Sequence, residues 1–219
     1  MEPIKAVSPT VSGTYKSSES YCEWNLLRAA FHTQPVFLKG IAMKQNRLKL
    51  YLIDIKYIRA LARVDDRVMS VSPQIHKDTR PFVGIIIICG NKKYCVPLSS
   101  PKEKHKTMKN DLDFTKIYDG DKLIGALNFN NMIPVEDTYT SVLNLRISST
   151  DTHAEQHYKK LAMKQLTFCQ QNQEAIIKKA NKLYDIITSE KAGGLLKRRC
   201  CDFLKLERAL EKQLSKQSD

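Results

Sequence analysis

The stretch Phe82-Val-Gly-Ile-Ile-Ile-Ile-Cys-Gly-Asn-Lys-Lys-Tyr-Cys-Val-Pro-Leu-Ser-Ser-Pro-Lys102 decides the fold of this 219-residue chain. Its first eight residues form a continuous apolar run, β-branched at Val83 and from Ile85 to Ile88, which predicts a strand buried on both faces. Gly90-Asn91 is typical of a tight turn, after which Lys92 to Leu98 returns as a second strand. The chain is therefore expected to be built around an antiparallel hairpin.

Further strands are predicted on both sides of this hairpin. Leu48 to Ile53 alternates like a strand, and Asp54 can cap a short helix with Ile55 and Ile58 on its apolar face. The predicted downstream strands are Phe114–Tyr118, Lys122–Phe129 across the turn Asp119-Gly120-Asp121, Ile133–Val135 and Val142–Leu145.

Helices dominate the last third of the chain. Asp151 can cap a helix that extends through Phe168, and a second helical pattern runs from Ile176 to Tyr184. Gly193-Gly194 interrupts the pattern, which resumes over Leu195 to Leu214. Because the strands come first and are joined by short hairpins rather than by βαβ crossovers, the predicted class is α+β, with an antiparallel sheet and segregated helices.

The domain organisation follows from a change in composition. Residues 1–46 are predicted to be an N-terminal extension, either a flexible arm rich in Ser, Thr and Gly or an arm packed on the body. Residues 47–214 are expected to form a single domain, and residues 215–219 a short tail. Met43 can also serve as a start, which would make the first 42 residues an upstream extension.

The charge favours a polyanionic partner. The formal net charge is +13 and the isoelectric point about 9.4, which points to nucleic acid, with a basic protein kept soluble by its charge as the alternative. No apolar run reaches the ~20 residues of a membrane helix, and no signal-peptide pattern opens the chain. The six cysteines show neither CxxC nor zinc spacing, so we expect reduced, mostly buried thiols in a cytoplasmic protein.

The segment Ser99-Ser-Pro-Lys-Glu-Lys-His105 carries the chemistry of greatest interest. Ser100 suits the N-cap of a helix, Pro101 its first position and Glu103 its third, a capping box whose unpaired N–H groups attract anions. Positive charge is added by Lys102, Lys104, His105, Lys106 and Lys109. Two serines and a lysine here can serve phosphodiester chemistry; the alternative is a well-capped surface helix with a solvated basic face.

Metal-dependent chemistry finds little support in the sequence. The aspartates between Asp111 and Asp121 have the wrong spacing for a calcium loop, and His153 and His157 lie one turn apart without the glutamate of HExxH. Ser99 and Lys102 also match the S-x-x-K string of penicillin-binding proteins, but no S-D-N or K-T-G follows. RNA cleavage needs no metal, because the ribose 2′-OH is itself the nucleophile. We therefore expect no metal and no cofactor.

An ordered series of short stretches resembles one protein family. The stretches, which span about residues 48–210, are Tyr51-Leu-Ile-Asp-Ile-Lys-Tyr57-Ile58, Asp65-Asp66-Arg67-Val68, Phe82-Val83-Gly84-Ile85, Pro97-Leu-Ser-Ser-Pro-Lys102 with His105, Asn131-Met132-Ile133-Pro134, Tyr158-Lys-Lys-Leu with Lys164-Gln165-Leu166, and Cys201-Asp202-Phe203. Together they resemble the ToxN/AbiQ family of type III toxin–antitoxin systems, and CptN within it. The resemblance implies a compact, twisted antiparallel sheet or barrel-like core related to MazF and Kid, with peripheral and C-terminal helices.

The resemblance also implies a function. Such a protein is a metal-independent, sequence-specific endoribonuclease of phage defence. It processes a repeated RNA antitoxin precursor and is inhibited by the resulting pseudoknots in a closed protein–RNA assembly. When free, it cuts cellular or phage RNA at A-rich sites, leaving 2′,3′-cyclic phosphate and 5′-OH ends. No membrane or DNA partner is expected.

The resemblance assigns roles to individual residues. The family's catalytic tyrosine falls on Tyr57, its threonine–serine pair on Ser99 and Ser100, and its lysine on Lys102, with Ser99 keeping the hydroxyl of the usual threonine. The alternative for Tyr57 is that it packs on the sheet beside Ile53 and Ile58. No counterpart exists for the N-terminal segment.

A larger set of residues is expected to bind RNA. Its members are Lys104, His105, Lys106, Lys109, Tyr158, Lys159, Lys160, Lys164, Gln165, Lys197, Arg198 and Arg199. Lys178, Lys179 and Lys182 form a further stripe that is either part of this surface or a solvated helix face. Two other functions remain open: an RNA-binding module without catalysis, and a DNA-binding regulator, for which no compact helix-turn-helix is evident.

Overall fold

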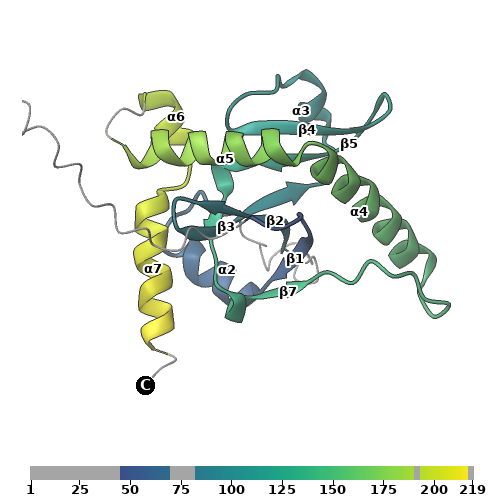
Figure 1. Cartoon of the computed structure of the whole chain (residues 1–219), viewed down its shortest axis with the longest axis horizontal. Coiled ribbons are helices and arrows are strands. Elements are labelled where there is room, and N and C mark those ends of the chain that lie inside the picture. Colours follow the sequence, from purple (N-terminus) through teal and green to yellow (C-terminus); the bar gives the residue numbers. More distant parts are fainter. Residues whose placement is uncertain (1–44, 70–81, 190–192, 217–219) are drawn as a thin grey trace, which may run out of the picture. The chain divides into compact units, whose positions relative to one another are not determined.

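The computed structural model describes residues 45–69, 82–189 and 193–216, all within one compact unit, Ala42–Asp219 (Figure 1). The predictions made for residues 1–44 and for the last three residues lie outside the described residues. Among the described residues, no helix is both long enough and apolar enough to cross a membrane.

One antiparallel sheet organises the chain. Its strands are β1 (Leu50–Ile53), β2 (Phe82–Cys89), β3 (Lys92–Ser99), β4 (Phe114–Asp119), β5 (Lys122–Asn128), β6 (Ile133–Pro134) and β7 (Thr140–Val142). The order is β4-β5-β3-β2-β1-β7, with β6 paired to β3, so the sheet is open, with β4 and β7 at its ends. The predicted α+β class with an antiparallel sheet is confirmed.

The predicted central hairpin is confirmed in its register. β2 and β3 pair from Gly84 opposite Pro97 to Cys89 opposite Lys92. Gly90 has φ +59°, a left-handed conformation that favours glycine in a two-residue hairpin turn. The expectation that β2 is buried on both faces is wrong, because Ile86 and Ile88 are only half-buried. An antiparallel strand needs cover on one face only, and α5 supplies it.

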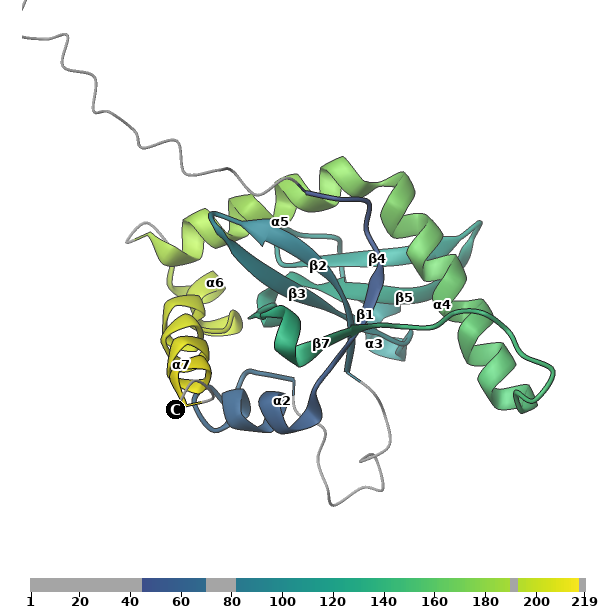
Figure 2. The same ribbon diagram turned by 60° about the horizontal axis from the view of Figure 1, so that its bottom comes forward.

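Helices surround this sheet (Figures 1 and 2). They are α2 (Ile55–Ala62), α3 (Glu103–Thr107), α4 (His153–Gln171), α5 (Gln173–Thr188), α6 (Gly194–Arg199) and α7 (Phe203–Ser215), with the 3₁₀ turns η2 (Phe129–Asn131) and η3 (Asp137–Tyr139). α4 packs against β4 and β5, α5 against β2, and α7 against β6 and α2. The sheet's β4–β5 end therefore lies under α4.

Local capping explains where two of these helices begin. Asp54 caps α2 as predicted, accepting hydrogen bonds from Lys56 N at 2.6 Å and Tyr57 N at 3.0 Å. The expectation that Asp151 caps α4 is wrong: Thr152 is the N-cap and forms a capping box with Glu155. The reason is that both Asp151 carboxylate oxygens accept from Lys159 Nζ, at 2.8 and 2.7 Å.

Two predicted elements differ in extent from the structure. The single helix expected over Leu195–Leu214 is two helices, because Cys201 N donates to Asn130 O over 2.8 Å and Asp202 then caps α7. The strand expected over Val142–Leu145 ends at Val142. The prediction of reduced thiols is confirmed for the five described cysteines, which are free and buried.

Candidate active site

Ser99 is the last residue of β3 and is held there by the sheet. It pairs with Ala126 of β5, which keeps its backbone extended. Asn128 donates from Nδ2 to Ser99 Oγ over 3.1 Å and also approaches Pro97 O at 3.4 Å. The Ser99 hydroxyl is therefore half-buried and fixed by a neighbouring strand, while Ser100 and Lys102 are exposed.

The predicted helix start at this site is wrong. α3 begins at Glu103, and its N-cap is Lys102, which has extended backbone angles and makes no side-chain capping bond. The sheet pairing of Ser99 and the preference of a residue before proline for extended backbone keep Ser100 out of a helix. The capping box of Ser100 and Glu103 and its anion site therefore do not form, and the exposed Ser100 side chain is not a helix cap.

Positive charge gathers around the segment. Burial, together with the ammonium groups of Lys102, Lys104 and Lys116, lowers the pKa of His105 below its usual value. His105 itself is buried, with its ring centroid 5.3 Å from that of Phe114. At neutral pH the local cations are therefore the lysines, and the imidazole is neutral.

Tyr57 lies apart from these residues. It is buried on α2, stacks on Tyr139 at 4.2 Å between ring centroids, and donates from its hydroxyl to Pro134 O over 2.7 Å. Burial raises the pKa of Tyr57 well above its usual value. Pro134 pairs with Tyr94, five residues before Ser99 on β3, a separation of roughly 16 Å along the strand. The structure therefore unites Ser99, Ser100 and Lys102 but not Tyr57.

The arrangement fits phosphoryl transfer. Hydroxyl protons and an ammonium group can stabilise a pentavalent phosphate and orient the attacking oxygen. Within the described ranges, no group of three or more His, Cys, Asp or Glu side chains is placed to hold a metal ion. The exposed Ser100, the oriented Ser99 and the exposed Lys102 are the groups here that carry such protons and charge.

The predicted RNA-binding residues fall into two groups. Nine are exposed: Lys104, Lys106, Lys109, Tyr158, Lys160, Lys164, Lys197, Arg198 and Arg199. Three of these nine form ion pairs, Lys106 with Glu103 at 2.9 Å, Lys164 with Asp119, and Arg199 with Asp113 at 3.1 Å. The other six are available to a ligand without breaking an ion pair among the described residues.

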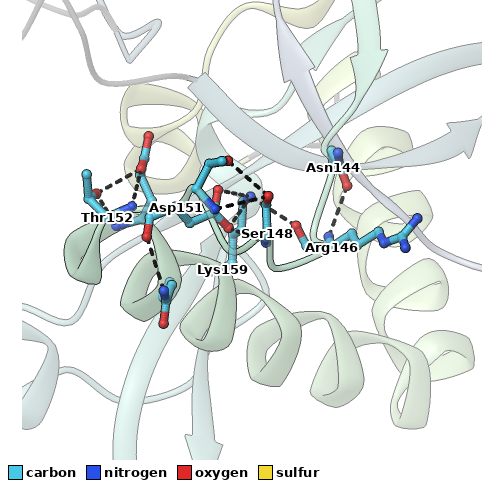
Figure 3. A network of polar contacts seen from close by, with 9 residues as sticks. Asn144, Arg146, Ser148, Asp151, Thr152 and Lys159 are labelled. Carbon is cyan, nitrogen blue, oxygen red and sulfur yellow. Dashed lines mark hydrogen bonds and ion pairs between the residues drawn. The ribbon is translucent and has the colours of Figure 1, made fainter.

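Lys159 is the most strongly engaged of the set. Figure 3 shows it reaching from α4 to Asp151, while Asp151 also accepts from Ser148 N over 2.7 Å. Lys159 Nζ further donates to Arg146 O over 3.0 Å. Three bonds from one ammonium thus fasten the loop before α4 to the helix, and we assign Lys159 to this structural contact.

Gln165 and Lys179 also point inward. Gln165 is buried and donates from Nε2 to Ile124 O over 2.8 Å, which ties α4 to β5. Lys179 Nζ donates to Asp111 O at 3.0 Å and Thr115 Oγ1 at 2.6 Å. We therefore remove Gln165 from the RNA-binding set, and the solvated-face alternative for the stripe does not apply to Lys179.

Sequence reasoning missed Asn128, which orients Ser99. The two residues are 29 positions apart in the chain, and no local pattern marks the asparagine. The only available signal was its place at the end of a predicted strand beside the central hairpin, where polar side chains from neighbouring strands can meet.

Comparisons with known proteins agree with this picture. The family described as "Toxin ToxN, type III toxin-antitoxin system" matches residues 49–211. Endoribonuclease ToxN of Pectobacterium atrosepticum is 30% identical over 165 residues, covering 73% of this chain and 90% of that protein. Endoribonuclease ToxN of Bacillus thuringiensis subsp. kurstaki is 32% identical over 164 residues, covering 73% and 80%.

Solved structures show the same fold. One, from work on selective toxin inhibition by a non-coding RNA pseudoknot in type III systems, has a TM-score of 0.65 at 28% identity and covers 77% of this chain and 98% of its own. AbiQ, a lactococcal anti-phage endoribonuclease, also has a TM-score of 0.65, at 25% identity, covering 78% and 99%.

Proposed function

This chain belongs to the ToxN family of type III toxin–antitoxin toxins, and we infer from this premise and from the site that it is an endoribonuclease inhibited by a pseudoknot RNA antitoxin. The observation that carries the inference is the placement of Ser99, Ser100 and Lys102 together in a basic surrounding. Its relatives include an anti-phage endoribonuclease, and phage defence is the matching role here.

The proposed reaction is a metal-independent transesterification. The ribose 2′-hydroxyl loses its proton as its oxygen forms a bond to the adjacent phosphorus, the bond from phosphorus to the 5′-oxygen breaks, and one proton is returned to that leaving oxygen, so the net proton count is unchanged. The products are a 2′,3′-cyclic phosphate and a 5′-OH end. Lys102 stabilises the negative charge on the phosphate oxygens, and the Ser100 hydroxyl donates a hydrogen bond to one of them. Ser99, with Asn128 behind it, orients the substrate.

Tyr57 has a supporting role in this proposal. Its hydroxyl already donates to Pro134 O, and its ring stacks on Tyr139. Both contacts hold α2 against the β6–η3 region. We therefore favour the packing alternative for Tyr57 over direct contact with RNA.

The proposal extends to partners and location. The antitoxin is a repeated RNA processed by the toxin into pseudoknots, which remain bound in a closed assembly through the exposed basic residues. The free toxin cuts cellular or phage RNA at A-rich sites and works in the cytoplasm, where these RNAs are found. Residues 47–214 form the toxin domain, with residues 1–46 as an extension and 215–219 as a tail.

The test is direct. Purified protein is incubated with a long A-rich transcript in EDTA, and the ends are mapped chemically. We expect cleavage with cyclic phosphate and 5′-OH ends, lost in Ser100→Ala and Lys102→Ala. Wild-type activity in both variants would point to another site. RNA binding by the wild-type protein without any cleavage would support a non-catalytic RNA-binding module.

A further inference from the structure

A cavity lies next to Ser99. Its volume is about 520 Å³, and its walls come from α3, the turn before β4, η2 and the end of α6. This volume falls within the ~300–1,000 Å³ typical of small-molecule sites. Asn128 connects it to the candidate active site, since this side chain both lines the cavity and donates to Ser99 Oγ.

The cavity has an exposed, positively charged rim and a buried wall. The lining residues Lys104 and Lys109 are exposed, whereas His105, Phe114 and Asp113 are buried. Cations at the rim suit the phosphate backbone of an RNA strand.

The interior is rich in hydrogen-bond acceptors. The amide nitrogens of Asn128, Asn130 and Asn131 donate to Ser99 Oγ, Arg199 O and Arg67 O. Within the described part of the chain, none of their Oδ1 atoms accepts a hydrogen bond. The Oδ1 atoms are therefore available to accept from a ligand, and a ligand that carries hydrogen-bond donors fits them.

Two further observations favour a neutral ligand over a second phosphate. Asp113 is buried in the lining and is balanced by Arg199, so an anion entering the cavity would meet a carboxylate. His105 Nδ1 is buried without a hydrogen-bond partner among the described residues. Leaving this atom unpaired is costly, and the imidazole, which is neutral at pH 7, adds no charge that would attract a second phosphate.

We propose that this cavity receives one unstacked nucleobase with an exocyclic amino group, beside the phosphate held by Ser99, Ser100 and Lys102. The amino group donates to the asparagine oxygens. The cavity is thus a specificity site that accepts adenine, cytosine or guanine and disfavours uracil. This proposal rests on the proposed ribonuclease function.

The first arm of the test uses the wild-type protein. The cleavage site is mapped on a long transcript and copied into a short oligoribonucleotide. Each base flanking the cut is then replaced in turn by an analogue that lacks only its exocyclic amino group. We expect one position at which this loss lowers kcat/KM by ~10-fold or more. Cleavage that is indifferent to every such replacement would overturn the proposal.

The second arm locates the effect in the cavity. Asn130→Ala is compared with Asn172→Ala, because each asparagine donates to a backbone carbonyl, Arg199 O at 3.2 Å and Phe168 O at 2.9 Å, but only Asn130 lines the cavity. We expect Asn130→Ala to cleave the natural oligonucleotide and its analogue without the amino group at similar rates. Asn172→Ala should still cleave the natural oligonucleotide faster than the analogue. Discrimination retained in a folded Asn130→Ala would overturn the assignment to this cavity.

The two arms also separate this proposal from the ribonuclease function. RNA cleavage without base discrimination overturns only the specificity site, whereas no cleavage by the wild-type protein overturns both. The analogue series on wild-type protein decides the matter even if Asn130→Ala fails to fold.

Discussion

Asn128 donates a hydrogen bond from Nδ2 to Ser99 Oγ over 3.1 Å, which occupies a lone pair of the serine and leaves its proton to be donated elsewhere. The contact joins the ends of β3 and β5 and gives Ser99 a defined direction. Ser100, one residue later, is exposed. Of the two serines, one is therefore oriented by the protein and the other is available to be oriented by substrate.

Asn128→Ala tests whether this contact orients the reaction. We expect kcat to fall by ~10-fold with little change in KM, because the contact acts on geometry rather than on binding. In a Ser99→Ala background the same substitution should have almost no further effect on kcat. Additive losses in the double variant would show that Asn128 acts independently of Ser99.

Lys102→Ala should remove charge stabilisation from the scissile phosphate. The expected loss in cleavage rate is ~10²–10³-fold, with an unchanged melting temperature because the side chain is exposed. Lys205→Ala, which removes an exposed lysine on α7, is the matched control and should cleave normally. A folded Lys102→Ala enzyme that still cleaves at the wild-type rate would exclude this role.

Tyr57→Phe distinguishes the packing role from a catalytic one. The substitution leaves Pro134 O without its donor in a buried region, and we expect unfolding free energy to fall by about 1–3 kcal/mol. Cleavage by the folded variant should stay within a few-fold of wild type. A large loss of rate at unchanged stability, measured by denaturant titration and kinetics, would instead place the hydroxyl in the reaction.

Lys160 and Lys159 are neighbours with different expected roles. Lys160 is exposed on α4, so Lys160→Glu should weaken binding of the antitoxin RNA and lower its salt dependence, with stability unchanged. Lys159→Ala should mainly lower the melting temperature, because it releases Asp151 and the loop before α4. Binding measured across a salt series tests the pair, and equal effects on affinity would contradict the distinction.

His105 should make stability depend on pH. Its folded-state pKa lies below its ordinary value of 6.5, so the unfolded chain takes up the proton more readily. The resulting stability is present above pH 6.5 and declines as the pH falls toward the folded pKa. His105→Phe lacks this group, so the difference in melting temperature between the two proteins should shift in favour of the variant on acidification. A constant difference from pH 7.5 to 5 would refute the prediction.

The sequence predicted those elements of the fold that are determined by residues close together in the chain. The apolar run of β2, the positive-φ glycines at positions 90 and 120 and the Asp54 cap predicted elements that the structure contains. The predictions were wrong where a residue distant in the sequence forms a hydrogen bond with a group that the local pattern assigned to a cap or a helix. Lys159 takes Asp151 from its predicted capping role, and Asn130 O draws the Cys201 N–H out of a continuous helix.

The site was predicted only in part for the same reason. The string from Ser99 to Lys102 is continuous in sequence, so its residues could be named together. The contact with Asn128 and the cavity beside it depend on tertiary pairing of β3 with β5. His105 and Gln165 belong to recognisable motifs, yet their burial depends on neighbours that a motif does not reveal.

Gly125 lies where α4 approaches the sheet too closely to leave room for a side chain. A Cβ atom at this position would lie 2.5 Å from Gln165 Nε2 and 2.9 Å from Ser99 O. The Gln165 side chain of α4 therefore lies directly against the β5 backbone, beside the carbonyl of Ser99. A ligand bound to α4 and a ligand bound at the serines would therefore contact two elements that pack directly against each other.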